Sequence, residues 1–507
     1  MATPSEKLAQ SLEVLKGLQD QGMVAIRSAD LPRTHRERLL SNGFLQEVMK
    51  GWYIPSQPDV AADESTTWYT SYWDFCLAYL DWRFGVDWCL SPEQSLLLLI
   101  GDRTVPRQLL VRSPKARNKV TELPYSTSLF DVRSTMPAEV NIEEVEGLRL
   151  YSIPSALITC SPGFYTQNPT NARVALSMVS DASTILSILL EGGHSTIAGR
   201  LAGAFRNIGR DRIAGDILKT MRAAGYTVRE KDPFETEIHP ILSIRETSPY
   251  VNRIRLMWQQ MREEVIKLFP SAPGKPKDPK AYMELVDGIY VTDAYHSLSI
   301  EGYRVSPEFI ERVRGGAWNP DENEDDRDHQ NALAARGYWQ AFEEVRKSVC
   351  KVVDGEDSGA VADEDHSSWY REMFAPCVTA GLLRPADLAG YRNNQVYIRR
   401  SMHVPPNYKA VRDAMPSFFD LLREETDPSV RVVLGHFVFV YIHPYMDGNG
   451  RIGRFLMNLM LASGGYPWTV VPTEKREEYM AVLEDASVNQ TIIPFTKFLA
   501  RLVKQNL

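Results

Sequence analysis

The chain has 507 residues, which is too long for one ordinary hydrophobic core, so two or three domains are expected. Its 44% hydrophobic and 24% charged residues are typical of folded soluble proteins and exclude a largely disordered chain. The formal net charge of −8 argues against a surface built for nonspecific binding to nucleic acid or anionic membranes, although a local basic patch is compatible with it.

The cysteines and the N-terminal residues indicate the compartment. The five cysteines form no CxxC pair and no zinc-ligand spacing, which favours free, buried thiols in a reducing compartment. Residues 1–15 lack the charged and apolar regions of a signal peptide, and no apolar run approaches the roughly 20 residues that a membrane helix needs. We therefore expect a cytoplasmic protein with no membrane partner.

Residues 1–58 predict a winged-helix-like domain. Leucines at helical spacing between Leu8 and Leu18 predict a first helix, two short helices are expected around residues 29–41, and a hairpin follows. The middle of this segment carries basic side chains at Arg33, His35, Arg36 and Arg38. A basic helix of this kind can enter the major groove, so residues 28–54 are a candidate DNA contact. A protein-interaction module with a solvated basic face is the alternative.

Residues 59–235 predict an α+β domain. Strand-like segments at residues 95–100, 108–112 and 148–153 precede helices between residues 171 and 224. Three stretches of the first 235 residues, LPRTHRERLLSNGFLQEVMKGWYIP, CLSPEQSLLLLIGDRTVP and SIPSALITC, resemble the AbiEi family of antitoxin-type regulators. The resemblance implies a winged helix followed by an α+β domain.

Residues 250–507 predict a helical domain, which begins after a junction near residues 230–250. Residues 270–279 and 319–328 are expected to be loops within it. Apolar repeats predict a bundle of about eight helices, at residues 251–269, 280–296, 306–314, 330–353, 407–424, 430–442, 450–463 and 475–505. The expected fold is therefore multidomain, with a winged helix and an α+β domain before an α-helical bundle.

Residues 448–454 carry the pattern of a phosphate site. Apolar spacing and a terminal glycine pair predict a helix over residues 450–463, so Gly448, Asn449 and Gly450 lie at its N-terminus. Unpaired amides and the positive end of the helix dipole attract anions there, and the two glycines let the N–H groups converge on a pyrophosphate. Arg451 and Arg454, one turn apart, add two positive charges.

The backbone N–H groups of residues 448–450 are here called the nest. Two residues just before the nest complete the candidate site. Asp447 offers a carboxylate oxygen to Mg²⁺, which typically takes one or two protein carboxylates together with phosphate oxygens and water. His443 can accept a proton from an attacking hydroxyl near neutral pH. Each element alone has an ordinary interpretation, namely a structural His-Pro pair, a DGNG turn and two solvated arginines. Their combination within residues 443–454 is what predicts a function.

A dinucleotide site is the rival interpretation of the same glycines. Residues 448–453, GNGRIG, satisfy the GxGxxG fingerprint, an apolar run precedes them, and Glu474 lies about 20 residues further on. That fingerprint requires its first glycine at the end of a strand in a βαβ unit, whereas here other residues intervene and the surrounding pattern is helical. An oxidoreductase is therefore the less favoured alternative.

The stretch HPYMDGNGRIGR resembles the Fic signature HPFx(D/E)GNGRxxR, with Tyr445 where phenylalanine is usual. The resemblance implies a protein adenylyltransferase that transfers AMP from Mg·ATP to a Ser, Thr or Tyr hydroxyl of a target protein, including the chain itself. It implies a base at His443, a Mg²⁺ ligand at Asp447, and phosphate binding by Gly448, Asn449, Gly450, Arg451 and Arg454. The catalytic set is then His443, Asp447, Asn449 and Arg451.

Two other segments resemble parts of the same family. Residues 390–398, GYRNNQVYI, and 403–406, HVPP, resemble the strand pair of a β-hairpin flap over the target side chain, whose edge could pair with an extended target segment. An ordinary hairpin is the alternative. Residues 297–302, SLSIEG, resemble the inhibitory pattern (S/T)xxxE(G/N), on a helix expected near residues 290–302.

Ser297 and Glu301 are four residues apart and share one helical face, with Gly302 at the helix end. The resemblance implies that Glu301 pairs with Arg454 in the place of the ATP γ-phosphate and so inhibits transfer. It also implies that such a glutamate can position water for de-AMPylation. A solvated glutamate at a helix end is the alternative.

Other functions stay open at this point. The same site could transfer another nucleotide or phosphocholine, because the fold fixes the phosphate geometry but not the base pocket. The chain could instead be a DNA-binding regulator that uses the Fic site as a sensor, which predicts promoter binding with a steep salt dependence. A homodimer is also left open.

Overall fold

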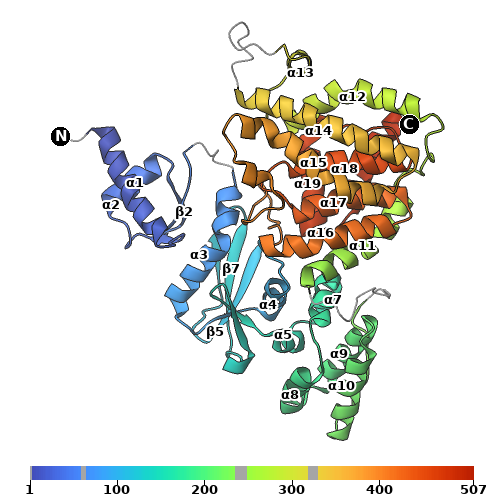
Figure 1. The fold of residues 1–507 in the computed structure, drawn as a ribbon. Coiled ribbons are helices and arrows are strands. Elements are labelled where there is room, and N and C mark those ends of the chain that lie inside the picture. Colours follow the sequence, from blue (N-terminus) through green and yellow to red (C-terminus); the bar gives the residue numbers. More distant parts are fainter. Residues whose placement is uncertain (1–2, 59–63, 235–247, 318–328) are drawn as a thin grey trace. The chain divides into compact units, whose positions relative to one another are not determined.

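The computed structural model describes residues 3–58, 64–234, 248–317 and 329–507. Its internal contacts divide the chain into two compact units (Figure 1). Unit 1 comprises Met1–Pro249 together with the short segment Tyr397–Val404, and unit 2 comprises Tyr250–Val396 and Pro405–Leu507. In the described parts of the chain, no helix combines the length and the hydropathy that crossing a membrane would require.

Unit 1 begins with two helices and a three-stranded antiparallel sheet. Its elements are α1 (Pro4–Asp20), β1 (Ile26–Arg27), α2 (Arg33–Ser41), β2 (Leu45–Met49) and β3 (Trp52–Pro55), and its antiparallel sheet has the order β1-β3-β2. The sequence predicts two short helices over residues 29–41. The prediction of the first is wrong, because residues 28–30 form a turn. Asp30 closes that turn by accepting hydrogen bonds from the backbone N–H of Arg27, at 2.9 Å, and from its guanidinium.

The next part of unit 1 is a small α+β fold. Its elements are α3 (Thr66–Phe84), β4 (Cys89–Leu90), α4 (Pro92–Leu99), β5 (Gln108–Ser113), β6 (Lys119–Leu123), β7 (Thr127–Arg133), the 3₁₀ turn η1 (Glu139–Asn141), β8 (Ile142–Val145) and β9 (Leu148–Tyr151). The central sheet has the order β4-β5-β7-β6, with β5 and β7 parallel, and β8 pairs with β9. The buried aromatic side chains of α3 form much of its core.

The strand expected at residues 95–100 is wrong, because these residues lie in and just after helix α4. Ser91 caps this helix by accepting a hydrogen bond from the N–H of Gln94, and Pro92 occupies its first turn. A continuous run of leucines has no hydrophobic periodicity, so it fits a buried strand as well as a buried helix. The helix-capping residue Ser91 was therefore the better indication of a helix. The strands expected at residues 108–112 and 148–153 are present as β5 and β9.

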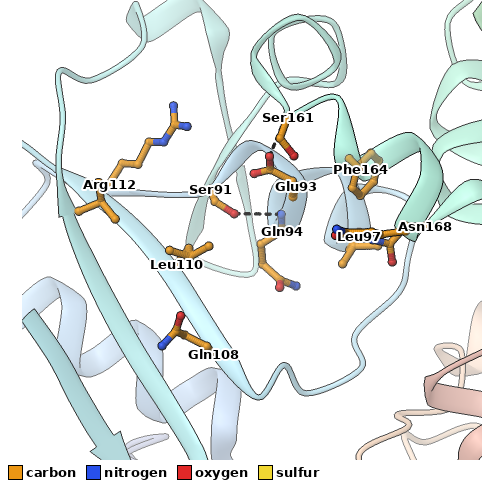
Figure 2. A pocket seen from close by; sticks show the side chains of 12 residues that line it. Ser91, Glu93, Gln94, Leu97, Gln108, Leu110, Arg112, Ser161, Phe164 and Asn168 are labelled. Atoms are coloured by element: carbon orange, nitrogen blue, oxygen red, sulfur yellow. Dashed lines mark hydrogen bonds between the residues drawn. The ribbon is translucent and has the colours of Figure 1, made fainter. Parts of the chain in front are cut away.

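Six further helices follow within the part of unit 1 that the structure describes. They are α5 (Ile153–Thr159), α6 (Gly163–Gln167), α7 (Pro169–Ser177), α8 (Ser183–Gly192), α9 (Ser195–Asn207) and α10 (Asp211–Ala223). A cavity of about 610 Å³ lies between α4, the outer face of β5 and helix α6 (Figure 2). None of the five cysteines forms a disulfide, as expected, although Cys350 is exposed rather than buried.

Unit 2 is a helical bundle, as the sequence predicts. Its helices are α11 (Pro249–Leu268), α12 (Pro279–Ile300), α13 (Pro307–Arg314), α14 (His329–Asp354), α15 (Ser358–Thr379), α16 (Tyr408–Glu424), α17 (Pro428–Ile442), α18 (Asn449–Ser463), α19 (Arg476–Val488) and α20 (Ile493–Asn506), with 3₁₀ turns η3 (Pro385–Leu388) and η4 (Thr473–Lys475). Helices α17 and α18 are buried on nearly all sides and carry the candidate site at their junction.

Two features of the bundle differ from expectation. Helix α15 was not predicted, because the polar residues 363–368 interrupt the apolar pattern of this segment. The buried side chains of Trp369, Tyr370 and Met373 follow that interruption. The single helix expected at residues 475–505 is two helices, since Gln490 has a left-handed backbone with φ of 53° and a proline then starts α20.

The predicted β-hairpin flap is also wrong in detail. Residues 390–406, here called the flap loop, form two extended arms with no strand, and all of them are described. Pro405 and Pro406 have no N–H to donate to a ladder. The arms are joined instead by the side chain of Gln395, whose Nε2 donates to the carbonyl oxygen of Pro405 at 2.9 Å. Arg400, with φ of 62°, lies in the turn between them.

Candidate active site

The candidate site begins where helix α17 ends. His443 is the C-cap of α17 and has a left-handed backbone with φ of 53°, which turns the chain away from the helix axis. Its Nδ1 lies 3.2 Å from the carbonyl oxygen of Val440. A proton on Nδ1 donates to this carbonyl, and the basic lone pair is then on Nε2.

Asn449 fixes the loop between the two helices. Its Oδ1 accepts from the N–H of Tyr445 at 2.9 Å, and its Nδ2 donates to the Tyr445 carbonyl at 2.9 Å. The Asn449 side chain is buried, and these two bonds use one of its two N–H donors and one lone pair of its Oδ1. The side chain therefore shapes the loop, and a contact of Asn449 with phosphate stays a prediction.

Both glycines of the nest are required by their surroundings. Gly448 has φ of 80°, and a Cβ there would lie 2.8 Å from the ring of Phe374. A Cβ on Gly450 would lie 2.5 Å from the Oε1 of Glu301 and 3.2 Å from the Nη1 of Arg454. Glycine at position 450 therefore leaves room for the carboxylate of Glu301, an anion that lies close to the N-terminus of α18.

Arg454 is the most strongly held group of the site. Its Nε donates to Ser297 Oγ at 2.9 Å, and its Nη2 donates to the Ser297 carbonyl at 3.1 Å and to Glu301 Oε1 at 2.7 Å. Glu301 caps helix α12, and Gly302 leaves the helix with φ of 93°. The structure thus brings together the three residues of the predicted inhibitory segment and the last arginine of the motif.

The electrostatics of this pair follow from burial and proximity. Burial raises the pKa of Glu301, but the guanidiniums of Arg454 and Arg451 outweigh it, so the pKa of this carboxyl is lowered. Burial lowers the pKa of Arg454, and the Glu301 carboxylate outweighs that effect, so the pKa of Arg454 is raised. The two groups therefore form a charged pair at neutral pH.

Arg451 lies on the same face of α18 and is also buried. Its guanidinium packs over the rings of Tyr303 and Phe374, and its Nη2 lies 3.3 Å from Asp447 Oδ2. Within the described residues, Arg451 Nε and Arg454 Nη1 are buried donors with no hydrogen-bond partner. Buried donors of this kind cost free energy until an acceptor arrives, so the site is suited to an anionic ligand.

A pocket of about 360 Å³ adjoins these groups. Its lining comes from the end of α12, the following residues, the start of α14 and the motif, and comprises Glu301, Gly302, Tyr303, Arg304, Gln330, Asn331, Asp447 and Arg451. All of these residues belong to unit 2. The pocket gives a polar space beside the nest in which a nucleotide could be held.

Asp447 is the residue that fits a metal ion. Its side chain is 67% exposed, with Oδ1 accepting from the N–H of Gly448 at 2.6 Å. Over the described ranges, no group of three or more His, Cys, Asp or Glu side chains could hold a metal. A single carboxylate suits Mg²⁺, which usually completes its shell with phosphate oxygens and water. The donor set therefore fits Mg²⁺ bound together with a nucleotide.

Tyr445, which stands where the Fic signature usually has phenylalanine, lies in the core of unit 2. It is buried and stacks on Tyr370, with ring centroids 3.8 Å apart and planes 7° apart. Within the described residues, its buried hydroxyl has no hydrogen-bond partner.

Arg392 is a residue that the sequence interpretation missed. It is buried, and its Nε donates to the His443 carbonyl at 2.8 Å while its Nη1 donates to the Asn394 carbonyl at 3.0 Å. Its Nη2 donates to the carbonyl of Pro406, on the other arm of the flap loop. Burial lowers the pKa of this guanidinium to about 10. An arginine in a polar loop is ordinarily solvated, so the sequence around Arg392 did not indicate that this side chain is buried.

The comparison with known proteins agrees with this geometry. A profile of the Fic/DOC family matches residues 366–461, and this part of unit 2 is a Fic domain. The protein adenylyltransferase Fic of Drosophila willistoni is 37% identical over 131 residues, covering 25% of this chain and 26% of that protein. Protein adenylyltransferase fic-1 of Caenorhabditis elegans is 35% identical over 121 residues, 23% of each chain.

The similarity covers a limited part of these proteins. The chain spans about a quarter of the length of the curated relatives named here. The solved structure of Fic-1 from C. elegans covers 67% of this chain and 96% of that one, with 19% identity and a TM-score of 0.38.

Proposed function

We propose that the chain transfers AMP from ATP to a Ser, Thr or Tyr hydroxyl of a target protein. One observation carries the proposal: a single loop of the Fic domain joins His443, Asp447 and the nest at the start of α18 to two buried arginines with unpartnered donors. The names of the relatives, protein adenylyltransferases, support the same reaction.

The proposed mechanism follows from these positions. The amides at residues 448–450 and the guanidiniums of Arg451 and Arg454 hold the phosphates of ATP. Asp447 would hold Mg²⁺ together with the nucleotide, and the bound ion would supply positive charge to the phosphate oxygens. His443 Nε2 takes the proton of the target hydroxyl, whose oxygen bonds to the α-phosphorus. The bond from the α-phosphorus to the bridging oxygen breaks, and pyrophosphate leaves with that electron pair.

The proposal includes a restraint by Glu301. Its carboxylate lies over Gly450 and binds Arg454 Nη2 at 2.7 Å, so it competes with an anionic phosphate for the same groups. We expect slow transfer until this carboxylate moves. We include de-AMPylation in the proposal, because the resemblance implies that a glutamate at this position can hold a water molecule for hydrolysis of the AMP ester.

Labelled ATP tests the reaction class. With the Glu301→Gly chain and Mg²⁺, we expect protein labelling from ATP labelled at the α-phosphate and none from ATP labelled at the γ-phosphate. Labelling from the γ-phosphate would indicate a kinase, and labelling from neither would contradict nucleotidyl transfer. Parallel reactions with labelled UTP, GTP and CDP-choline test the other donors, among which we expect ATP to be preferred.

The winged-helix-like part offers no observation that favours a second function. Arg36 donates to the Ser28 carbonyl at 3.0 Å and lies over the ring of Tyr53. Arg38 donates to Ser11 Oγ at 2.8 Å, and Arg33 pairs with Glu37 at 2.6 Å. The basic groups that predicted a DNA contact at residues 28–54 are therefore engaged within the domain. DNA binding, the AbiEi resemblance, a homodimer and the cytoplasmic location stay predictions.

A further inference from the structure

The cavity between α4, β5 and α6, here called the unit 1 cavity, is not used by the reaction proposed above. Its floor is the outer face of β5, where Gln108, Leu110 and Arg112 lie at alternate positions (Figure 2). Alternate side chains of a strand point to one face, roughly 7 Å apart. Helix α4 and residues 161–168 form much of the walls, and every lining residue is described and belongs to unit 1. A volume of about 610 Å³ is typical of a small-molecule site.

Two side chains of opposite charge line this cavity. Arg112 Nη1 donates to the Tyr151 hydroxyl at 3.2 Å, and its guanidinium lies over the ring of the same tyrosine. Glu93 Oε1 accepts from the backbone N–H of Ser161 at 2.8 Å. In the described parts of the chain, neither Arg112 nor Glu93 has an ion-pair partner. Both are half-buried, so each has lost part of its hydration without gaining a counter-charge.

Both charges act on one hydroxyl group. Burial raises the pKa of Tyr151, the Arg112 guanidinium lowers it, and the Glu93 carboxylate raises it. Because the effect of a charge falls with distance, both groups lie near the Tyr151 hydroxyl, at the same end of the cavity. A ligand at this end meets a cation and an anion together. The arrangement suits a molecule that carries both charges.

The remaining lining is uncharged. Leu110 is 37% exposed on the floor, and Leu97 adds apolar surface from α4. The Gln94 side chain is 7% exposed, and within the described residues its Nε2 is a buried donor with no hydrogen-bond partner. The terminal torsion of glutamine is soft, so a rotation can direct this donor into the cavity. An unpaired buried amide costs free energy until an acceptor binds it, so this part suits an aliphatic group that ends in a carbonyl.

We propose that the unit 1 cavity binds a free α-amino acid with a long, uncharged side chain. The α-carboxylate binds Arg112, and the α-ammonium binds Glu93. The lining holds one cation and one carboxylate, both used by the α-groups, so a charged side chain would find no partner. The methylenes of the ligand lie against Leu110, and its polar end accepts from Gln94. This inference goes beyond the proposed function and does not depend on AMP transfer.

Calorimetric titration of the full chain with L-glutamine, in the absence of ATP, tests the inference. Two analogues remove one charge each: N-acetyl-L-glutamine lacks the ammonium, and L-glutaminamide lacks the carboxylate. We expect saturable binding of L-glutamine and at least about tenfold weaker binding of each analogue. L-Glutamate and L-lysine, with charged side chains, should also bind more weakly. No saturable binding of L-glutamine at millimolar concentration, or equal binding of L-glutamine and both analogues, would overturn the inference.

Two variants assign the charges to their residues. Glu93→Gln keeps an acceptor for the Ser161 N–H and should weaken binding of L-glutamine but not of N-acetyl-L-glutamine. Arg112→Gln should weaken binding of L-glutamine but not of L-glutaminamide. Glu122→Gln, the same change at an exposed carboxylate of β6, is the control and should bind L-glutamine as the wild type does. Wild-type affinity for L-glutamine in both cavity variants would overturn the inference. The comparison of analogues needs no variant, so it decides the question even where a variant does not fold.

Discussion

Glu301 Oε1 lies 2.7 Å from Arg454 Nη2 and over the backbone of Gly450, so one carboxylate contacts both the last arginine of the motif and the start of helix α18. This position is chemically equivalent to that of a bound phosphate oxygen, because a helix N-terminus and a guanidinium both favour an anion. The chain therefore supplies its own anion to the site that we propose for ATP.

Glu301→Gly should raise AMP transfer, because it removes the competing anion and leaves Arg454 for the γ-phosphate. A charge-assisted contact contributes about 1.5–3 kcal/mol, which corresponds to a gain of about tenfold or more. The rate of self-labelling with α-labelled ATP measures this. Glu301→Gly combined with Arg454→Ala should lose the gain, and Glu284→Gly, which places a glycine on the exposed face of α12, should show none. An unchanged rate in folded Glu301→Gly would show that this segment does not inhibit.

His443→Ala should abolish transfer and keep ATP binding, since the imidazole acts on the hydroxyl and not on the phosphates. Loss of a general base typically costs about 10²–10⁴ in rate. His443 has a left-handed backbone, which alanine tolerates poorly, so His443→Asn is the better matched variant. Transfer rates and ATP affinity should be measured on both. Near wild-type transfer by His443→Asn would remove the histidine from its proposed role.

His436 should make the stability of the Fic domain depend on pH. It is buried between Gly453 O and Tyr479 Oη, each at 2.7 Å, and burial lowers its pKa to about 4. Because the folded pKa lies below the unfolded value, stability is complete above about pH 6.5 and falls as pH drops toward 4. The loss is on the order of 3 kcal/mol. Urea unfolding of wild type and His436→Gln across this range measures it, and equal slopes for the two chains would contradict the assignment.

Arg392→Ala should destabilise the flap loop, because it removes the guanidinium that donates to the carbonyls of His443, Asn394 and Pro406, the last of them in a buried hydrogen bond. The expected cost is about 2–4 kcal/mol, seen as a lower thermal midpoint. Arg412→Ala, at an arginine on the nearby helix α16 with a mostly exposed side chain, is the control and should have a smaller effect. Comparable losses in the two variants would argue against a special position for Arg392.

The parts of the fold that follow from local patterns were predictable. The apolar run before His443 and the glycines around Asn449 define helices α17 and α18 and the loop between them without tertiary information. The Glu301 and Arg454 contact joins residues far apart in the chain, and only the family resemblance pointed to it.

Other features depend on tertiary contacts that a pattern does not show. The leucines of α4 fit a strand as well as a helix until the Ser91 cap is weighed. The buried position of Arg392 arises from carbonyls of three separate segments, and the packing of Tyr397–Val404 within unit 1 has no counterpart in sequence spacing.

Mass spectrometry of the purified Glu301→Gly chain after incubation with Mg·ATP tests the central claim most directly. We predict AMP in phosphodiester linkage to a Ser, Thr or Tyr hydroxyl, present in this variant, weaker in wild type and absent when His443→Asn is added. A correctly folded Glu301→Gly chain that binds ATP but carries no AMP, on itself or on proteins of an added cell lysate, would contradict the proposed function.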